Sequence, residues 1–502
     1  MVKKIFSFLS KEVSDLHEAA YLLAFFTFAS QILAIVRDKL LAYNFGADIE
    51  LDIYYAAFRI PDLIFVSIGS IVSVSVLLPF ITEAYSDSKE KGRRFTDSIF
   101  SIFFFSLIIT SIIVIIFTDP LLKILLPGLR DSTKFEELVW MTRILLLSPI
   151  FLGISNFISN ITQMHKRFLV YALSPIVYNI GIIFGILFLY PKFGLYGLSF
   201  GVIIGAFVHM FIQLPFIIGR GISPRLTLNI DWNQVKKVLL VSLPRTLALS
   251  SSQLTSFFLI SLASLMSGGA ISIFNLALNL QSVPLAIVGV SYSSAIFPAL
   301  SKYFVDGEKD KFISKIIESG RHIIFWSVPI TILFIVLRAQ IVRTIFGAGN
   351  FDWSDTRLTA AALALFVISV TAQSLILLFM RACYARGKTR MPLLVNVFSS
   401  LIIVILAYLL SHIFNMAPVF EYFIEDMFKV SGEMGTIILV LPLSYTIGNI
   451  LNLVIYWYIY EKDYPGLSRA ILPSFYQIFA GSVIMGYVTF ISLRFFNVYF
   501  PL

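Results

Sequence analysis

The stretch Ser98–Thr118 reads SIFSIFFFSLIITSIIVIIFT, and it is apolar on every face of a helix. At a rise of about 1.5 Å per residue, about 20 such residues cross a hydrocarbon core roughly 30 Å thick. A spanning β-strand would instead alternate apolar and polar residues over roughly ten positions. Only a helix satisfies its own backbone hydrogen bonds in lipid over so long an apolar run. The stretch therefore predicts a transmembrane α-helix.

Runs of this kind recur along the whole chain of 502 residues, of which 58% are hydrophobic and only 13% charged. This composition lies outside that of soluble proteins and excludes a soluble multidomain enzyme. We predict an all-α integral membrane protein of about thirteen helices. The predicted spans are residues 19–43, 52–84, 96–118, 137–164, 168–190, 194–219, 237–266, 271–300, 322–337, 357–380, 391–413, 435–460 and 469–495.

The basic residues are concentrated in alternate loops, for example at 89–94 and 381–390. The positive-inside rule then places these loops and the N-terminus in the cytoplasm, with the chain in the cytoplasmic (inner) membrane. The net charge of +9 is spread over loops beside anionic lipid headgroups, which indicates membrane lipids as partners and no nucleic acid. Residues 1–18 have a short apolar stretch that charges interrupt, which predicts a cytoplasmic amphipathic segment and no cleavable signal peptide.

Two halves of the chain share a pattern. Gly46 and Pro61 match Gly269 and Pro284, with both pairs 223 positions apart. Parallel repeats of this kind predict two pseudo-symmetric six-helix bundles, the architecture of a transporter. We expect an N-lobe at 19–230 (the first six spans), a C-lobe at 231–460 (the next six spans) and an additional C-terminal helix at 461–502.

Charged side chains inside spans are costly in lipid, so they mark a cavity, a partner or a ligand. Four arginines qualify: Arg37, Arg59, Arg143 and Arg245. We interpret Arg143 and Arg245, near the ends of their spans, as snorkelling to the interface. Asp38 and Asp52 lie close in sequence to Arg37 and Arg59. Arg59 is spaced to pair with Asp62 on one helix face, so structural and functional roles stay open for it. Neighbouring Asp38 projects about 100° around the helix from Arg37. We therefore expect the partner of Arg37 to come from another helix or from a ligand.

Catalytic patterns are weak by comparison. The histidines show no metal-ligand spacing. We interpret the single cysteine, Cys383, as a small apolar residue that fills space between helices. Glu421, Glu425 and Asp426 are expected to form a solvated acidic turn outside the membrane. The sequence thus predicts a protein that is not an enzyme, with no cofactor and no metal.

Three blocks carry a family resemblance: IVRDKLLAYNFGADIELDIYYAAFRIPDL (Ile35–Leu63), IVRTIFGAGNFDWSDTRLTAAALALF (Ile341–Phe366) and RACYARGKTRMP (Arg381–Pro392). With them the chain resembles the MurJ/MviN lipid II flippase family of the multidrug/oligosaccharidyl-lipid/polysaccharide exporter (MOP) superfamily. The resemblance implies a V-shaped, two-lobed transporter with a cationic cavity. It implies substrate binding at Arg37, Asp38, Asp52 and Arg59, whereas Leu259 stands where some members have an acidic sodium ligand.

The resemblance also implies a cargo and partners. The cargo would be lipid II, the undecaprenyl-pyrophosphate-linked peptidoglycan precursor, moved by alternating access during cell wall biosynthesis. Cell-wall synthesis proteins are further partners that fit this role. The alternatives are a polysaccharide or teichoic-acid lipid flippase or a multidrug exporter of the same superfamily. A membrane glycosyltransferase and a non-transporting scaffold belong to other functional classes.

Overall fold

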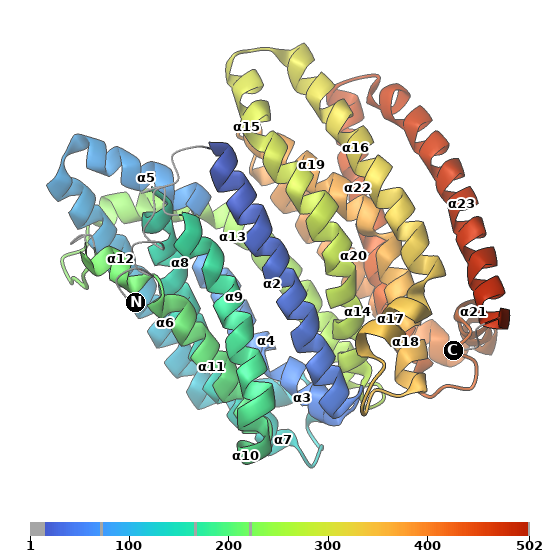
Figure 1. Ribbon diagram of the computed structural model, residues 1–502. Helices are drawn as coiled ribbons and strands as arrows, with labels where there is room; N and C mark the ends of the chain where they lie inside the picture. The colour runs from blue at the N-terminus through green and yellow to red at the C-terminus, as the bar shows by residue number, and fades with distance from the viewer. Residues whose placement is uncertain (1–15, 71–73, 165–167, 220–222, 500–502) are drawn as a thin grey trace. The chain divides into compact units, whose positions relative to one another are not determined.

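The computed structural model describes residues 16–70, 74–164, 168–219 and 223–499, and every element in these residues is helical (Figure 1). Of the amphipathic segment predicted at 1–18, residues 1–15 lie outside the described part. The chain divides into two compact units, Met1–Leu41 with Ile49–Phe257, and Ala42–Asp48 with Phe258–Leu502. The lobe bounds of 19–230, 231–460 and 461–502 stay a prediction.

Among the described residues, the first unit holds twelve α-helices in whole or in part. They are α2 (Leu16–Phe45), α3 (Ile49–Ala57), α4 (Arg59–Gly69), α5 (Val74–Asp87), α6 (Lys89–Leu125), α7 (Phe135–Leu145), α8 (Ser148–Met164), α9 (Phe168–Phe184), α10 (Tyr190–Phe193), α11 (Leu195–Phe211), α12 (Leu214–Gly219) and the larger part of α13 (Trp232–Ser264).

The described part of the second unit holds the end of α13, the short segment Ala42–Asp48 and ten further α-helices. They are α14 (Ala270–Pro284), α15 (Ser291–Val305), α16 (Lys309–Val336), α17 (Arg338–Phe346), α18 (Trp353–Ile368), α19 (Val370–Ala385), α20 (Arg390–Met416), α21 (Pro418–Phe428), α22 (Val440–Asp463) and α23 (Leu467–Tyr499).

Ten helical segments of the described residues are long and apolar enough to cross a membrane, and each coincides with a predicted span. The prediction of an all-α membrane protein is thereby confirmed. The predicted spans 19–43 and 194–219 fall on α2 and on α11 with α12. The prediction of one continuous span at 52–84 is wrong, because α3, α4 and α5 divide this region.

The interruption between α3 and α4 falls at Phe58. Pro61 stands four residues after Ala57 and has no N–H to donate to the Ala57 carbonyl, and its ring crowds that carbonyl. The helix resumes at once, since the backbone N–H of Asp62 donates to the Phe58 carbonyl at 2.8 Å. The break places Arg59 at the start of a new helix.

Glycines let helices of the first unit approach closely. A Cβ added to Gly181 in α9 would lie 2.3 Å from the Gly205 Cα in α11, and one added to Gly185 would lie 2.6 Å from the Gly201 Cα. These separations leave no room for a side chain. Small residues four apart on two facing helices give membrane bundles their tightest van der Waals packing.

The second unit is built around aromatic and aliphatic side chains of α15, α16, α19 and α22. At its centre Phe379 stacks on Tyr460 with 4.7 Å between ring centroids. The segment Ala42–Asp48 docks onto the loop before α18, where the Asn350 backbone N–H donates to the Tyr43 carbonyl at 2.9 Å. The Asp355 carboxylate accepts the Ala47 N–H at 3.0 Å and also completes the N-terminal capping box of α18.

The repeated glycines have a common structural role. Gly46 and Gly269 both have positive φ, at 65° and 87°, and each stands shortly before a helix, α3 or α14. Non-glycine residues rarely adopt this conformation. The matching prolines also both mark irregular helix: Pro61 follows the break at Phe58, and Pro284 is followed by the π-helical turn Leu285–Val290.

Candidate functional site

Arg37 lies on α2 and forms an ion pair with its neighbour Asp38. Its Nε donates to Asp38 Oδ1 at 2.9 Å, and its Nη2 lies 2.8 Å from the same oxygen. The expectation that Arg37 finds its partner only on another helix or a ligand is therefore wrong. The 100° separation describes the Cα–Cβ directions, whereas the long arginine side chain curls around the helix to reach the carboxylate. The Asp38 side chain is 4% exposed and that of Arg37 21%.

A second helix fixes the other side of this guanidinium. Arg37 Nη1 donates to Asn179 Oδ1 of α9 at 3.2 Å. The Asn179 amide in turn donates to the Ser30 hydroxyl at 3.2 Å and to the Pro175 carbonyl at 3.1 Å. Three of the five guanidinium N–H groups thus point at protein oxygens. The remaining two are directed at neither Asp38 nor Asn179.

Tyr55 of α3 brings the second predicted arginine into the same neighbourhood. It lies within electrostatic range of Arg37, Asp38 and Arg59. The Tyr55 side chain is 8% exposed, and within the described residues its hydroxyl has no hydrogen-bond partner. A buried hydroxyl in that state is costly unless something else satisfies it. Arg37, Asp38, Tyr55 and Arg59 together form what we call the α2–α4 site.

Arg59 is held from α13. Its Nη1 donates to the Ser256 hydroxyl at 3.4 Å. Further along the same two segments, the hydroxyls of Ser67 and Ser250 lie 3.1 Å apart, and Ser70 donates to Thr246 at 2.9 Å. As the residue number rises from 59 to 70 on one segment, it falls from 256 to 246 on the other, so the two segments pack antiparallel. This packing fixes the start of α4, and with it Arg59, relative to α13.

Asp52, the fourth predicted site residue, lies in the first turn of α3 and is 2% exposed. The partners of Arg37 among the described residues are Asp38 and Asn179, so Asp52 is not bonded to it. A carboxylate in the first turn of a helix is favoured by the helix dipole. The structure thus gathers Arg37, Asp38 and Arg59 around Tyr55 and sets Asp52 on the same helix as that tyrosine.

Sequence reasoning did not single out Asn179, Tyr55 or Ser256. Asn179 is an amide inside the apolar span 168–190, and such a residue is a signal that a helix faces a polar partner. Serine and tyrosine are too common in membrane helices to stand out. Their positions in the site follow only from the packing of α3, α9 and α13.

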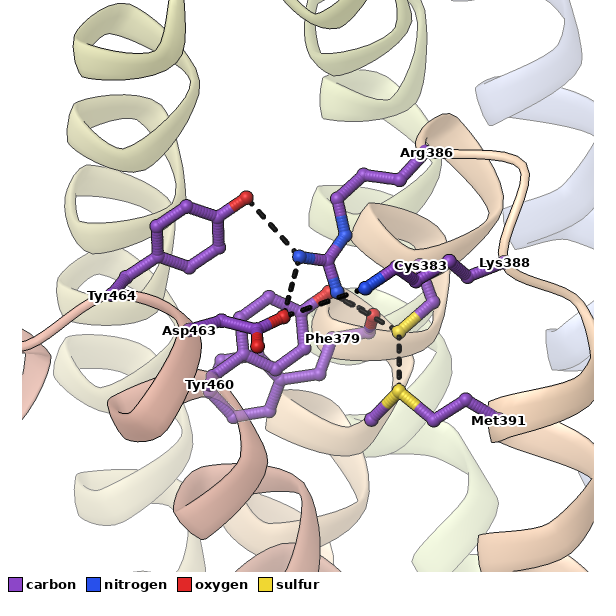
Figure 2. A network of polar contacts seen from close by, with 8 residues as sticks. All are labelled: Phe379, Cys383, Arg386, Lys388, Met391, Tyr460, Asp463 and Tyr464. Carbon is purple, nitrogen blue, oxygen red and sulfur yellow. Dashed lines mark hydrogen bonds and ion pairs between the residues drawn. The ribbon is translucent and has the colours of Figure 1, made fainter.

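The third family-like block, Arg381–Pro392, forms a different cluster in the second unit (Figure 2). Arg386 Nη1 donates to Asp463 Oδ2 at 2.8 Å and to the Tyr464 hydroxyl at 3.1 Å. Its guanidinium also lies over the Tyr460 ring, 5.1 Å from the centroid. The Tyr460 hydroxyl donates to the Phe379 carbonyl at 3.0 Å. This cluster joins the end of α19 to the end of α22.

The acidic residues near 421–426 belong to helix α21 and do not form a turn. Asp426 is exposed, as expected, whereas Glu425 is 9% exposed and accepts a hydrogen bond from the Thr436 hydroxyl at 2.7 Å. Among the described residues, no group of three or more histidine, cysteine or acidic side chains is arranged to hold a metal ion. Leu259, at the position of the acidic sodium ligand of some family members, is fully buried.

Comparisons with known proteins match nearly the whole chain. The sequence model of the family described as "Lipid II flippase MurJ" matches residues 41–501. A protein of Burkholderia cenocepacia named "Lipid II flippase MurJ" is 27% identical over 387 residues, 75% of each chain. A "Probable lipid II flippase MurJ" of Bdellovibrio bacteriovorus is 26% identical over 490 residues, 94% of this chain and 89% of the relative.

Solved structures agree on the fold. "Lipid II flippase MurJ, inward closed conformation" has a TM-score of 0.76 at 23% identity and covers 94% of this chain and 93% of that one. An inward-facing MATE family transporter of the MOP superfamily has a TM-score of 0.71 at 15% identity, over 88% and 96% of the two chains. The chain therefore shares its fold with these two membrane transporters. The family model covers most of the chain, so the chain belongs to the lipid II flippase MurJ family.

Proposed function

We propose that this chain is a lipid II flippase of the cytoplasmic (inner) membrane, with its N-terminus in the cytoplasm. It would carry the undecaprenyl-pyrophosphate-linked peptidoglycan precursor to the outer leaflet by alternating access. The observation that carries the proposal is a partly exposed arginine inside a membrane helix, beside a buried tyrosine hydroxyl without a described partner. Family membership over residues 41–501 supports lipid II as the cargo.

The chemistry suits a pyrophosphate. Arginine binds phosphate oxygens through charge-assisted, often bidentate hydrogen bonds, and two N–H groups of Arg37 are directed away from Asp38 and Asn179. Asp38 and Asn179 hold the guanidinium in one orientation, which lowers the entropy lost when a ligand binds. Arg59 supplies a second positive charge and Tyr55 a hydroxyl donor. Transport needs no covalent step, so each of these residues would bind and orient.

Asp38 also limits how tightly the site binds. Its carboxylate partly neutralises Arg37 and repels an arriving anion, so the headgroup competes with a resident carboxylate. A transporter needs this balance, because a headgroup that is held too firmly on one side is not released on the other. Asp52 and Arg59, near the start of α3 and of α4, would meet the outer part of the headgroup.

The leading alternatives keep the superfamily and change the cargo. A polysaccharide or teichoic-acid lipid flippase would present a polyprenyl pyrophosphate or phosphate to the same arginines. A multidrug exporter would favour cationic drugs, for which a site with Arg37 and Arg59 has the wrong sign of charge. The family match makes lipid II the first cargo to test.

Complementation decides between these cargoes. The chain is expressed in bacteria whose own lipid II flippase is under conditional control, and growth is followed after that flippase is depleted. We expect growth to be restored, with labelled lipid II appearing at the outer face. Membrane insertion of the chain without rescue, together with transport of another polyprenyl-linked glycan in vesicles, would assign it to that glycan instead.

The proposed orientation has its own test. Reporters fused after Lys91 and after Lys311 should indicate a cytoplasmic location, and a reporter at Glu421 an external one, because basic loops are retained inside. A cytoplasmic reading at Glu421 together with an external reading at Lys311 would invert the second unit and contradict the proposed topology.

A further inference from the structure

A basic cavity of about 930 Å³ opens at one end of the second unit. It lies where α16 and α23 end and α18 begins, beside α17 and α21 (Figure 1). Its size falls within the range of small-ligand pockets. The cavity is open, since Trp353 and Phe490 of its wall remain 57% and 52% exposed. Four basic side chains line it: Arg338, Arg357, Lys429 and Arg494.

Among the residues that the structure describes, one of these cations is paired with a carboxylate. Arg357 pairs with Glu433, and its Nε donates to the Lys429 carbonyl at 3.0 Å. Within the described residues, no ion pair joins Arg338, Lys429 or Arg494 to a carboxylate, and no described lining residue is acidic. Arg338 is anchored by one bond from Nη1 to the Ile335 carbonyl at 3.0 Å. Three positive charges therefore converge on one open cavity, an arrangement that attracts an anion.

The surroundings indicate an amphiphile as the occupant. The cavity adjoins the ends of candidate membrane spans. The amphipathic ring of Trp353 suits the interface between headgroups and acyl chains, whereas the apolar ring of Phe490 suits the acyl chains themselves. Within the most apolar stretch of α23, only 11% of the residues are buried in the protein. Exposed side chains such as Ile484 and Tyr487 continue from Phe490 along this helix. A phosphate held by the arginines would thus have its acyl chains beside α23.

We propose that this cavity binds the phosphodiester headgroup of an anionic phospholipid, with the acyl chains along α23. The site lies wholly in the second unit and is separate from the α2–α4 site in the first. It does not depend on which cargo the protein transports. The charge pattern of the loops would place it in the outer leaflet.

The test measures binding to the purified full chain in detergent by native mass spectrometry. The probes are phosphatidylglycerol, phosphatidylcholine and inorganic phosphate. Arg338→Gln/Arg494→Gln should weaken phosphatidylglycerol binding roughly tenfold, since it removes two charge-assisted contacts. The matched control, Arg130→Gln/Lys192→Gln, removes two exposed basic residues of the first unit and should bind as the unchanged chain does. Phosphatidylcholine should bind more weakly throughout.

Arg494→Glu guards against a folding artefact, because Arg494 is exposed at the end of α23 and its replacement leaves the core intact. It should lower phosphatidylglycerol binding without shifting the melting temperature. Equal binding by all variants would overturn the proposal. Binding of inorganic phosphate without any retention of phosphatidylglycerol would make the ligand free phosphate, and preference for a polyprenyl pyrophosphate would make the cavity a cargo subsite. Either result also rejects the phospholipid.

Discussion

Two arginines, one in each unit, form ion pairs of the same length and differ in what those pairs connect. Arg37 and Asp38 lie 2.8 Å apart and are neighbours on α2. Arg386 and Asp463 are also 2.8 Å apart, yet they belong to different segments, 77 residues apart in sequence (Figure 2). The Arg386 side chain is 5% exposed and lies against two tyrosine rings, whereas Arg37 keeps 21% of its surface open.

The comparison separates two uses of a buried arginine. The Arg386 pair joins the end of α19 to the end of α22. Its loss would lower the free energy of unfolding, because packing contacts would be lost and the Asp463 carboxylate would be left without its partner. The Arg37 pair fastens a residue to its own helix, and only the 3.2 Å bond to Asn179 reaches α9. A buried pair that joins two helices therefore indicates a role in stability. A pair within one helix, whose arginine side chain stays 21% exposed, leaves that arginine available to bind a ligand.

The largest effect is expected from Arg37→Ala. We expect flipping by the reconstituted chain and rescue of the depleted strain to be abolished, while expression and melting temperature stay near those of the unchanged chain. Arg37→Lys should retain part of the activity, because an ammonium keeps the charge and loses the bidentate geometry. Full transport by Arg37→Ala, or failure of that variant to insert, would make Arg37 structural like Arg386.

Arg386→Ala should show the opposite profile. Removing one partner of a buried pair costs several kcal/mol, and because Asp463 is 33% exposed we expect roughly 2 kcal/mol here. The melting temperature in detergent should fall by several degrees, with flipping per folded molecule retained. Lys388→Gln is the matched control, since Lys388 lies 3.7 Å from the same carboxylate but is 56% exposed. Equal destabilisation by Arg386→Ala and Lys388→Gln would show that the burial of Arg386 adds nothing to the stability that its ion pair provides.

Asn179→Ala tests the one contact that ties Arg37 to another helix. A hydrogen bond to a charged group contributes about 1.5–3 kcal/mol, so the flipping rate should fall roughly tenfold to a hundredfold as the guanidinium loses its fixed orientation. Asn156→Ala serves as the control, because it removes an amide from the neighbouring helix α8 without touching Arg37. A loss as complete as that of Arg37→Ala would mean that Asn179 itself contacts the cargo.

The membrane spans were predictable because apolar length alone decides them, and ten were confirmed in position. Local departures from a regular helix, and the partners of individual side chains, were not predictable in this way. The span 52–84 was predicted as one helix although Pro61 lies in its path, and the effect of that proline depends on the carbonyl of Ala57. The partner of Arg37 was predicted wrongly because helix geometry fixes Cβ directions and leaves a long side chain free to turn.

The contacts that complete the α2–α4 site join residues 142 and 197 positions apart. No periodicity within one helix reports such pairs, so Asn179 and Ser256 could be recognised only as polar residues in apolar spans. The three family-like blocks carried the resemblance to the family, and two of them have structural roles. Arg381–Pro392 supplies the Arg386 cluster, and Ile341–Phe366 contains the capping box of α18.

The smallest effect is expected from an exposed ion pair. Lys134 Nζ lies 3.1 Å from Glu50 Oε1, and both side chains are 33% exposed. The hydrogen bond to Glu50 raises the pKa of Lys134 above its ordinary value of 10.5. A raised lysine pKa stabilises the folded state below that ordinary value, and the contribution is lost as the pH rises through the folded-state pKa. Exposed ion pairs contribute about 0–1 kcal/mol to the free energy of unfolding and are screened by salt.

Lys134→Gln should therefore lower the melting temperature by about a degree at low salt and neutral pH. The difference should vanish at high salt or above the pKa of Lys134. Both pairs join residues far apart in sequence, 84 and 77 positions, and differ in burial. A drop as large as that of Arg386→Ala would show that burial of the cation does not decide how much an ion pair stabilises this protein.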